Sequence, residues 1–338
     1  MKSWGKYQKY FVEFIGNFLC LLVFWGGMLR QSFNADTIFH MVVEDADIRT
    51  NIEAGRYIIS LCDYILFKLG IRVTDNQSIT TFLALVMFAL AMICIQHIFK
   101  QWIPEKPIYR AGYYIGTNLV FLNVLFSELL MFGECCFYFG LGYLMAAAAV
   151  YLFTKRKYVG MVIALAFAVC TYQYTMIFAA VLIAFYLCLS YEGELSQKAI
   201  WHEVIGVMAC ISMGICNLLS IKLLERSGLI QEFGKHAGVG DIRAKIRLAI
   251  DSFIGLNESS ADILPGLWFP LLFTLMLMVL IVYSCIKEHK SGRILYIVMV
   301  LLFGNTIAVF QFCSDESFCQ QYTGWSVYKY VLSGNVEV

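Results

Sequence analysis

Apolar runs of about twenty residues recur along this chain, and no other feature constrains its fold as strongly. The first run covers 10–30 and the last covers 293–312. A helix needs about 20 apolar residues to cross the hydrocarbon core of a bilayer. Because backbone groups inside a bilayer must be hydrogen-bonded within the protein, such runs predict an all-α fold, a polytopic transmembrane helical bundle. The composition agrees: 60% of the residues are hydrophobic and 14% are charged, whereas soluble domains carry about 25% charged residues.

Nine spans are predicted, in a single integral membrane domain that covers 1–338. The run 158–190 is too long for one helix and too short for two full spans with a loop, so it is predicted to form two short helices that meet near Tyr172-Gln173. The run 10–30 lacks a clear small-residue cleavage site, and we interpret it as a span and not as a signal peptide. The predicted spans are 10–30, 78–98, 113–132, 135–154, the two halves of 158–190, 201–222, 266–286 and 293–312.

Basic residues in the short connections set the predicted orientation. They gather before the first span, around 100–110, at 155–157 and around 287–293, and short loops rich in Lys and Arg stay in the cytoplasm. We therefore predict a multi-pass protein of the plasma membrane with a cytoplasmic N-terminus. Four features then lie on the extracytoplasmic side: the long loops 31–77 and 223–265, the Gly133-Glu134 turn and the Tyr172-Gln173 break.

Both long loops contain a stretch with apolar residues at helical spacing. The stretch 53–70 ends at Gly70, and the stretch 242–256 places its apolar residues on one stripe. Both are too short to span, so they are predicted to lie as amphipathic helices in the membrane interface. A loop as long and as charged as 31–77 is more typical of a working surface than of a connector.

Carboxylates stand out in the first loop. Asp36 directly follows the first span, where it can act as a general base or cap a helix that begins at Thr37, and the two roles do not exclude each other. Glu44, Asp45 and Asp47 can hold a divalent cation through oxygen ligands or form a solvated acidic face. Because the chain shows no His or Cys pair at metal-site spacing, no metal site is predicted; a divalent cation remains compatible but not required.

Arginines in the two loops are candidate phosphate ligands, since a guanidinium can donate to two phosphate oxygens at once. Arg56 opens an apolar stretch beside Gly55, so it is expected to point inward or along the interface, where it needs an anionic partner. The other candidates are Arg49, Arg243, Lys245 and Arg247, and contact with lipid head groups explains the last three equally well.

Polar residues inside the apolar runs are further candidates. Glu128 lies within a run and must face a cavity or pair with a base, while Glu134 follows the same run and can simply cap the next helix. Tyr172 and Gln173 lie at the predicted helix break. There they can bind a hydroxyl-rich ligand or form hydrogen bonds between helices.

The remaining features are less informative. The twelve cysteines include no CxxC motif, and a Cys313–Cys319 disulfide stays open because spacing alone does not bring two sulfur atoms together. No basic patch indicates nucleic acid as a partner.

Three of these stretches, taken in order, resemble the Gtr type II glucosyltransferases, integral membrane enzymes that modify O-antigen and other envelope glycans. An acid-Thr pair follows the first span (Asp36-Thr37), a Gly-Arg pair opens an amphipathic helix about twenty residues later (Gly55-Arg56), and a Tyr-Gln pair lies in the fifth apolar stretch (Tyr172-Gln173). The chain departs from the family pattern at two positions. Ile38 stands where a second acid often follows the first, and Asn51 stands where an aromatic residue often lies four residues before the glycine.

The resemblance implies a GT-C-like enzyme. Such an enzyme takes a sugar, typically glucose, from a polyprenyl-phosphate carrier and transfers it to a cell-envelope glycan on the extracytoplasmic side. Asp36 would be the base, Arg56 would bind the leaving phosphate with the other loop cations, and Glu44, Asp45 and Glu134 would be secondary acids. The sugar and acceptor cleft would include Tyr172, Gln173 and Glu128.

Two other functions compete with this one. The first is a flippase or transporter of lipid-linked sugars, and the second is an assembly subunit without activity. A transporter is expected to place polar residues at mid-membrane and often shows repeated halves, whereas the polar residues here gather in the two long loops. We therefore expect a sugar donor, a glycan acceptor and the lipid bilayer as partners.

Overall fold

The structure, a computed structural model, describes residues 2–30, 46–122, 129–130, 132–190 and 197–229. The elements in these ranges are all helices, which confirms the all-α class for this part of the chain. They fall in a single structural unit. Several predicted features lie outside the described residues: Asp36, Glu44, Asp45, Glu128, Arg243, Lys245, Arg247, the Cys313–Cys319 pair and the spans 266–286 and 293–312.

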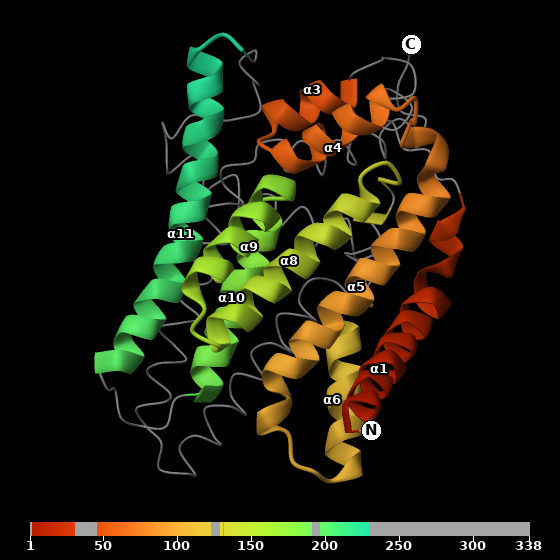
Figure 1. Cartoon of the computed structure of the whole chain (residues 1–338), viewed down its shortest axis with the longest axis vertical. Helices are drawn as coiled ribbons and strands as arrows, with labels where there is room; N and C mark the ends of the chain where they lie inside the picture. The colour runs from red at the N-terminus through yellow and green to blue at the C-terminus, as the bar shows by residue number, and fades with distance from the viewer. Residues whose placement is uncertain (1, 31–45, 123–128, 131, 191–196, 230–338) are drawn as a thin grey trace, which may run out of the picture. The chain divides into compact units, whose positions relative to one another are not determined.

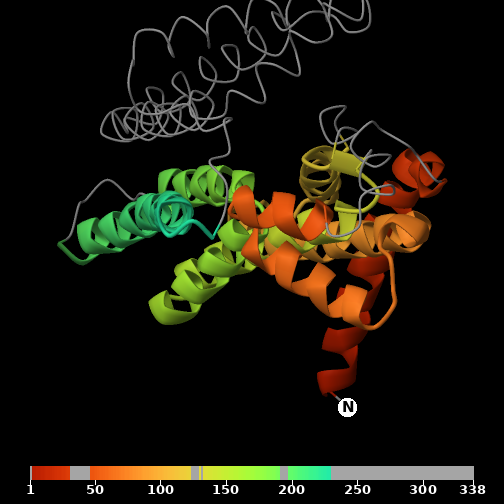
Figure 2. The ribbon, with the colours of Figure 1, turned by 90° about the horizontal axis from the view of Figure 1, so that it is seen from above.

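Long helices form the body of this unit, and two short helices lie across one of its ends (Figure 1). The crossing pair is α3 (Ala46–Glu53) and α4 (Tyr57–Lys68), and we name the end that they cover the α4 end. Figure 2 shows the unit from above, with this pair towards the viewer. The other elements are α1 (Lys2–Trp25), η1 (Gly26–Leu29), η2 (Thr74–Asn76), α5 (Gln77–Phe99), η3 (Lys100–Trp102), α6 (Pro107–Leu119), α8 (Cys136–Thr154), α9 (Tyr158–Thr171), α10 (Tyr174–Ser190) and α11 (Gln197–Arg226).

The centre of the unit lies where α5 packs against α8. Gly140 of α8 comes so close to α5 that a Cβ on it would lie 2.9 Å from the carbonyl oxygen of Ala84. Small residues at such a contact let two membrane helices approach closely. Aromatic rings fill the neighbouring space, with Phe88, Phe121 and Tyr143 in mutual contact at centroid distances of 5.1–5.9 Å. This packing gives the bundle a firm core.

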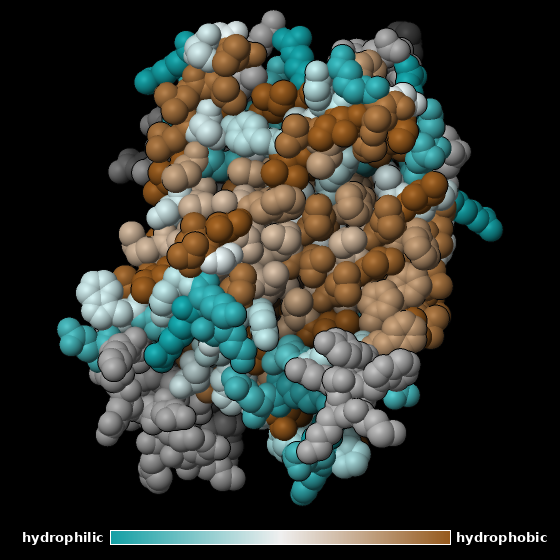
Figure 3. Space-filling model, in the orientation of Figure 1, coloured by the Kyte–Doolittle hydropathy of each residue, from teal (hydrophilic) through white to brown (hydrophobic). Residues whose placement is uncertain are grey.

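The outer surface of the unit is that of a membrane protein. Val23, Ile163 and Val181 are each more than half exposed, and Figure 3 shows hydrophobic side chains across the middle of one face, with hydrophilic ones mostly towards its upper and lower edges. A band of exposed apolar side chains this broad is unusual for a soluble monomer. Among the described residues, four helical segments are long and apolar enough to cross a bilayer: Gln8–Leu29, Thr74–Trp102, Cys136–Thr154 and Trp201–Arg226.

The prediction for 158–190 is confirmed, because α9 ends at Thr171 and α10 begins at Tyr174. The structure differs from the prediction over 113–132. There α6 begins earlier, with Pro107 in its first turn, and ends at Leu119. Its 13 residues form a helix about 20 Å long, which is shorter than a bilayer core. The total of nine spans therefore stays a prediction.

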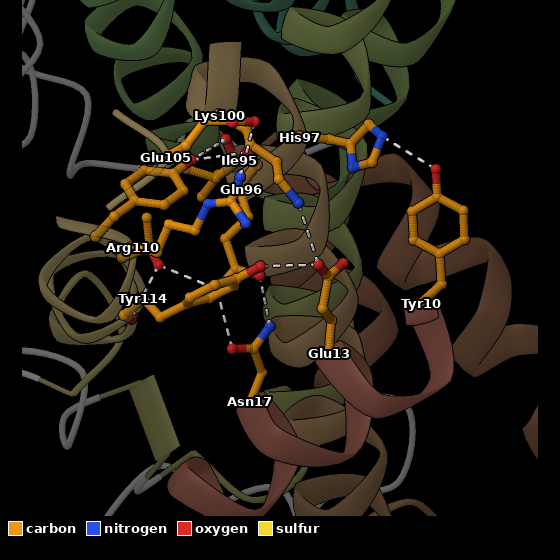
Figure 4. Close-up of polar contacts among 12 residues, drawn as sticks. Tyr10, Glu13, Asn17, Ile95, Gln96, His97, Lys100, Glu105, Arg110 and Tyr114 are labelled. Carbon is orange, nitrogen blue, oxygen red and sulfur yellow. Dashed lines mark hydrogen bonds and ion pairs between the residues drawn. The ribbon is translucent and has the colours of Figure 1, made fainter. Parts of the chain in front are cut away.

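A polar network joins α1, α5 and α6 away from the α4 end (Figure 4). Asn17 and Gln96 exchange two hydrogen bonds of 3.0 Å. Glu13 accepts a 2.8 Å hydrogen bond from the hydroxyl of Tyr114 and pairs with Lys100 at 3.5 Å. An open groove of about 840 Å³ runs beside this network between α1 and α6. Because buried polar groups are costly without partners, these bonds explain how α1 tolerates Glu13 and Asn17 within an apolar helix.

Candidate anion-binding site

The turn between α3 and α4 contains the Gly-Arg pair that stands out in the sequence. Because α3 ends at Glu53 and α4 begins at Tyr57, the helix predicted over 53–70 is in fact shorter. The cause is Gly55, whose φ of +73° is a left-handed conformation that interrupts a helix. A Cβ on this residue would also lie 2.7 Å from Ile221 of α11. Both the backbone angle and the close approach of α11 therefore require glycine.

Two side-chain amides from other helices hold the carbonyl groups of this turn. Gln173, in the break between α9 and α10, donates a hydrogen bond to the carbonyl oxygen of Ala54. Asn217 of α11 donates to the carbonyl oxygen of Gly55 at 3.0 Å. The two amides also approach each other, with 3.5 Å between Gln173 Nε2 and Asn217 Oδ1. Three segments that are far apart in the sequence thus meet at one turn.

Arg56, the next residue, forms no ion pair within the part of the chain that the structure describes. Its Cζ lies 5.5 Å from the centroid of the Tyr172 ring, a distance at which a cation and an aromatic ring attract. Tyr172 is itself buried against Phe139, with 4.5 Å between the ring centroids. The Nε of Arg56 is buried and has no hydrogen-bond partner. Because a buried polar atom without a hydrogen-bond partner is costly, this geometry favours an anionic partner for the half-buried guanidinium.

The helix that begins after Arg56 is attached to the bundle along its buried face. Asp63, two turns further on, accepts a 2.6 Å hydrogen bond from the hydroxyl of Tyr138 on α8. Tyr57 and Ser220 of α11 share a 2.7 Å hydrogen bond. Burial raises the pKa of Tyr57 above its ordinary value, so the phenol keeps its proton at neutral pH. These contacts attach α4 to α8 and α11.

Among the described candidates, Tyr172 and Gln173 are the ones that the structure brings to the Gly55-Arg56 turn. Arg49 is exposed, pairs with Glu53 at 3.0 Å and lines a separate cavity of about 340 Å³. Glu134 is buried in the turn that precedes α8. No group of three His, Cys, Asp or Glu side chains with metal-site geometry occurs within the described ranges.

Sequence reasoning missed three residues of this region: Asn217, Asp63 and Tyr138. A signal existed for two of them. Asn217 is an amide within an apolar run, and such residues usually find a hydrogen-bond partner on another helix. Asp63 lies seven residues after Arg56, which places both on one face of a helix. Tyr138 gave no signal, because a tyrosine in an apolar run is equally typical of a packed core.

The described part of the chain is that of a helical membrane protein, and at one end it holds an arginine over a tyrosine ring with no ion pair among the described residues. A family model described as glucosyl transferase GtrII matches residues 27–328, and the chain belongs to this family. The comparisons with curated proteins and with solved structures gave no match. The match confirms the resemblance to this family, and it indicates that the protein is a glycosyltransferase.

Proposed function

We propose that this enzyme transfers glucose from a polyprenyl-phosphate carrier to a cell-envelope glycan, and that the α4 end is its reacting, extracytoplasmic face. The observation that carries the proposal is the Arg56 guanidinium, which is held over Tyr172 and forms no ion pair among the described residues. A lipid-linked phosphate is an anion that a membrane enzyme can receive at such a position.

The chemistry explains why a fixed arginine is useful here. The acceptor hydroxyl attacks the anomeric carbon of the sugar, a new C–O bond forms, and the bond from that carbon to the carrier phosphate breaks. The phosphate leaves with the electron pair and gains one negative charge, while a base takes the hydroxyl proton. Arg56 would stabilise the charge that develops on the phosphate, which is the kind of electrostatic stabilisation that lowers a barrier most. Asp36, outside the described residues, is the proposed base.

The contacts of Tyr172 and Gln173 refine their proposed roles. The ring of Tyr172 supports the guanidinium of Arg56. The amide of Gln173 is used by the carbonyl oxygen of Ala54 and by Asn217, which favours hydrogen bonding between helices over direct contact with sugar. A tyrosine at this place can meet the donor phosphate and its sugar together with Arg56.

Transfer of labelled glucose from polyprenyl-phosphate-glucose by the purified, reconstituted protein tests the proposal. Arg56→Gln is expected to lower kcat/KM about 100- to 1,000-fold, as the loss of a group that stabilises developing charge does. Arg56→Lys keeps the charge but loses the two-pronged donor geometry, so an intermediate loss is expected. Asp36→Asn is expected to abolish transfer if this carboxylate is the base.

Lys68→Gln is the matched control. Lys68 is the last residue of α4, whereas Arg56 precedes this helix, and it is also a cation over an aromatic ring. A distance of 5.3 Å separates its Nζ from the Tyr64 ring centroid. Its removal is expected to leave transfer unchanged. If Arg56→Gln transfers glucose with the same kcat/KM as the unmodified protein, this arginine is not the phosphate ligand. A folded native protein that transfers no glucose, but moves the lipid-linked sugar across vesicles, would favour transport.

A further inference from the structure

Asn217 is a buried polar residue, 6% exposed, on a helix that is otherwise apolar enough to cross a membrane. In such surroundings an amide is destabilising unless its hydrogen bonds are made. Asn217 makes them with the α3–α4 turn and with Gln173, 162 and 44 residues away in the sequence. The residue therefore connects α11 to the segment that carries Arg56.

The peptide group between Gly55 and Arg56 is held at both of its polar atoms. Its carbonyl oxygen accepts the 3.0 Å hydrogen bond from Asn217. Its N–H donates to the carbonyl oxygen of Asn51 at 2.8 Å. Because a peptide group is planar and rigid, two hydrogen bonds on opposite edges fix its orientation. Together with the φ angle of Arg56, −94°, that orientation sets the direction in which the Arg56 side chain leaves the backbone.

The surroundings leave this peptide group little freedom to turn. Gly55 has a φ of +73°, and the side chains of Ile221 and Asn217 pack directly against it. The preceding carbonyl, that of Ala54, is held by Gln173. Two successive carbonyl groups are thus bound by two amides, and the guanidinium that follows lies over Tyr172.

We propose that Asn217 is a positioning residue for the donor phosphate: it acts through the Gly55–Arg56 peptide group and holds the guanidinium where the phosphate binds. This inference rests on the proposed function of Arg56. Asn217 itself does not touch the phosphate. Its loss would let the turn rotate, so that Arg56 would meet the phosphate less often and at poorer geometry.

Inhibition of glucose transfer by polyprenyl monophosphate, the product lipid, measures the phosphate site directly. Asn217→Ala is expected to raise the inhibition constant about tenfold, near the upper end of what one hydrogen bond contributes. Asn217→Ser serves as a second, milder variant in case the first does not fold. Size-exclusion chromatography and thermal unfolding in detergent show whether each variant is folded.

Ser220→Ala is the matched control. Ser220 lies one turn after Asn217 on α11 and also bonds to the α4 segment, at 2.7 Å to the Tyr57 hydroxyl, but it does not hold the Gly55–Arg56 peptide group. Its removal is expected to leave the inhibition constant unchanged. An equal rise for Ser220→Ala and Asn217→Ala would overturn the inference, because any loosening of α4 from α11 would then have the same effect.

A double-mutant cycle distinguishes positioning from a general structural role. In an Arg56→Gln background, Asn217→Ala is expected to change the inhibition constant less than twofold, because the cation that it positions is gone. The same tenfold rise in both backgrounds would overturn the inference while leaving Arg56 as a phosphate ligand. If Arg56→Lys and Arg56→Gln both keep the inhibition constant and the transfer rate of the unmodified protein, Arg56 is not a phosphate ligand. That result would contradict the proposed function, and the inference with it.

Discussion

Gly55 and Gly70 have the same backbone angle, a φ of +73°, in different surroundings. Gly70 follows α4, and a Cβ on it would meet no atom within 4 Å. A Cβ on Gly55 would meet Ile221 at 2.7 Å and Asn217 at 3.0 Å. The pair therefore separates the effect of the backbone angle from the effect of packing against α11.

Substitution of each glycine by alanine tests this difference. Gly70→Ala is expected to lower the free energy of unfolding by about 1–2 kcal/mol, the usual strain of a left-handed residue. Gly55→Ala carries the same strain and a steric overlap that adds about 1–3 kcal/mol, and it is expected to impair glucose transfer as well. Thermal unfolding in detergent measures the stabilities. Equal losses for the two variants would show that α11 does not approach Gly55 as closely as described.

At the scale of elements, α4 depends on two tyrosine hydroxyls that differ in their partners. Tyr138 donates to the carboxylate of Asp63, and both residues are buried. Tyr57 bonds to the neutral hydroxyl of Ser220. Tyr138→Phe is expected to lower the free energy of unfolding by about 1.5–3 kcal/mol, since a hydrogen bond to a charged group contributes that much.

Tyr57→Phe is the comparison for that prediction. It also removes a phenol oxygen from a contact of α4, but the bond to a neutral group is expected to contribute only about 0.5–1.5 kcal/mol to the free energy of unfolding. Chemical unfolding of both variants in mixed micelles gives the difference. A larger loss of stability for Tyr57→Phe than for Tyr138→Phe would contradict the expectation that Tyr138 donates to a charged Asp63.

The helix boundaries show what periodicity in a sequence can and cannot reveal. The break at Tyr172-Gln173 was predictable, because the apolar run around it is too long for one helix. The start of α4 was not, since the apolar spacing continues through Gly55 and only the tertiary contact with α11 reveals its left-handed angle. The early start of α6 could have been read from Pro107, which suits the first turn of a helix.

At the scale of the whole molecule, contacts between distant segments decide the site. The sequence identified Arg56, Tyr172 and Gln173 separately, and their common family pattern suggested that they act together. Which atoms meet depends on how three helices pack, and no spacing within one helix encodes that. Asn217 was missed for this reason: its partners lie 162 residues away for Gly55 and 44 for Gln173.

The proposed orientation of the molecule has its own test. A phosphatase that is active only after export, fused after Gly70 at the end of α4, is expected to be active. The same enzyme fused after Lys157, in the basic turn between α8 and α9, is expected to be inactive, because such turns stay in the cytoplasm. The reverse pattern would place the α4 end, and the proposed reaction, on the cytoplasmic side.

The long separation between Gly55 and Asn217 has a consequence for biosynthesis. When the ribosome has completed α4, neither Gln173 nor Asn217 exists, and the turn before Arg56 lacks the amides that hold its carbonyl groups. The arginine acquires its final setting only after α11 has been made and has packed against the α3–α4 turn. A nascent or prematurely terminated chain can therefore enter the membrane before the proposed phosphate site is complete. Completion of that site depends on the insertion of α11, which begins only at residue 197.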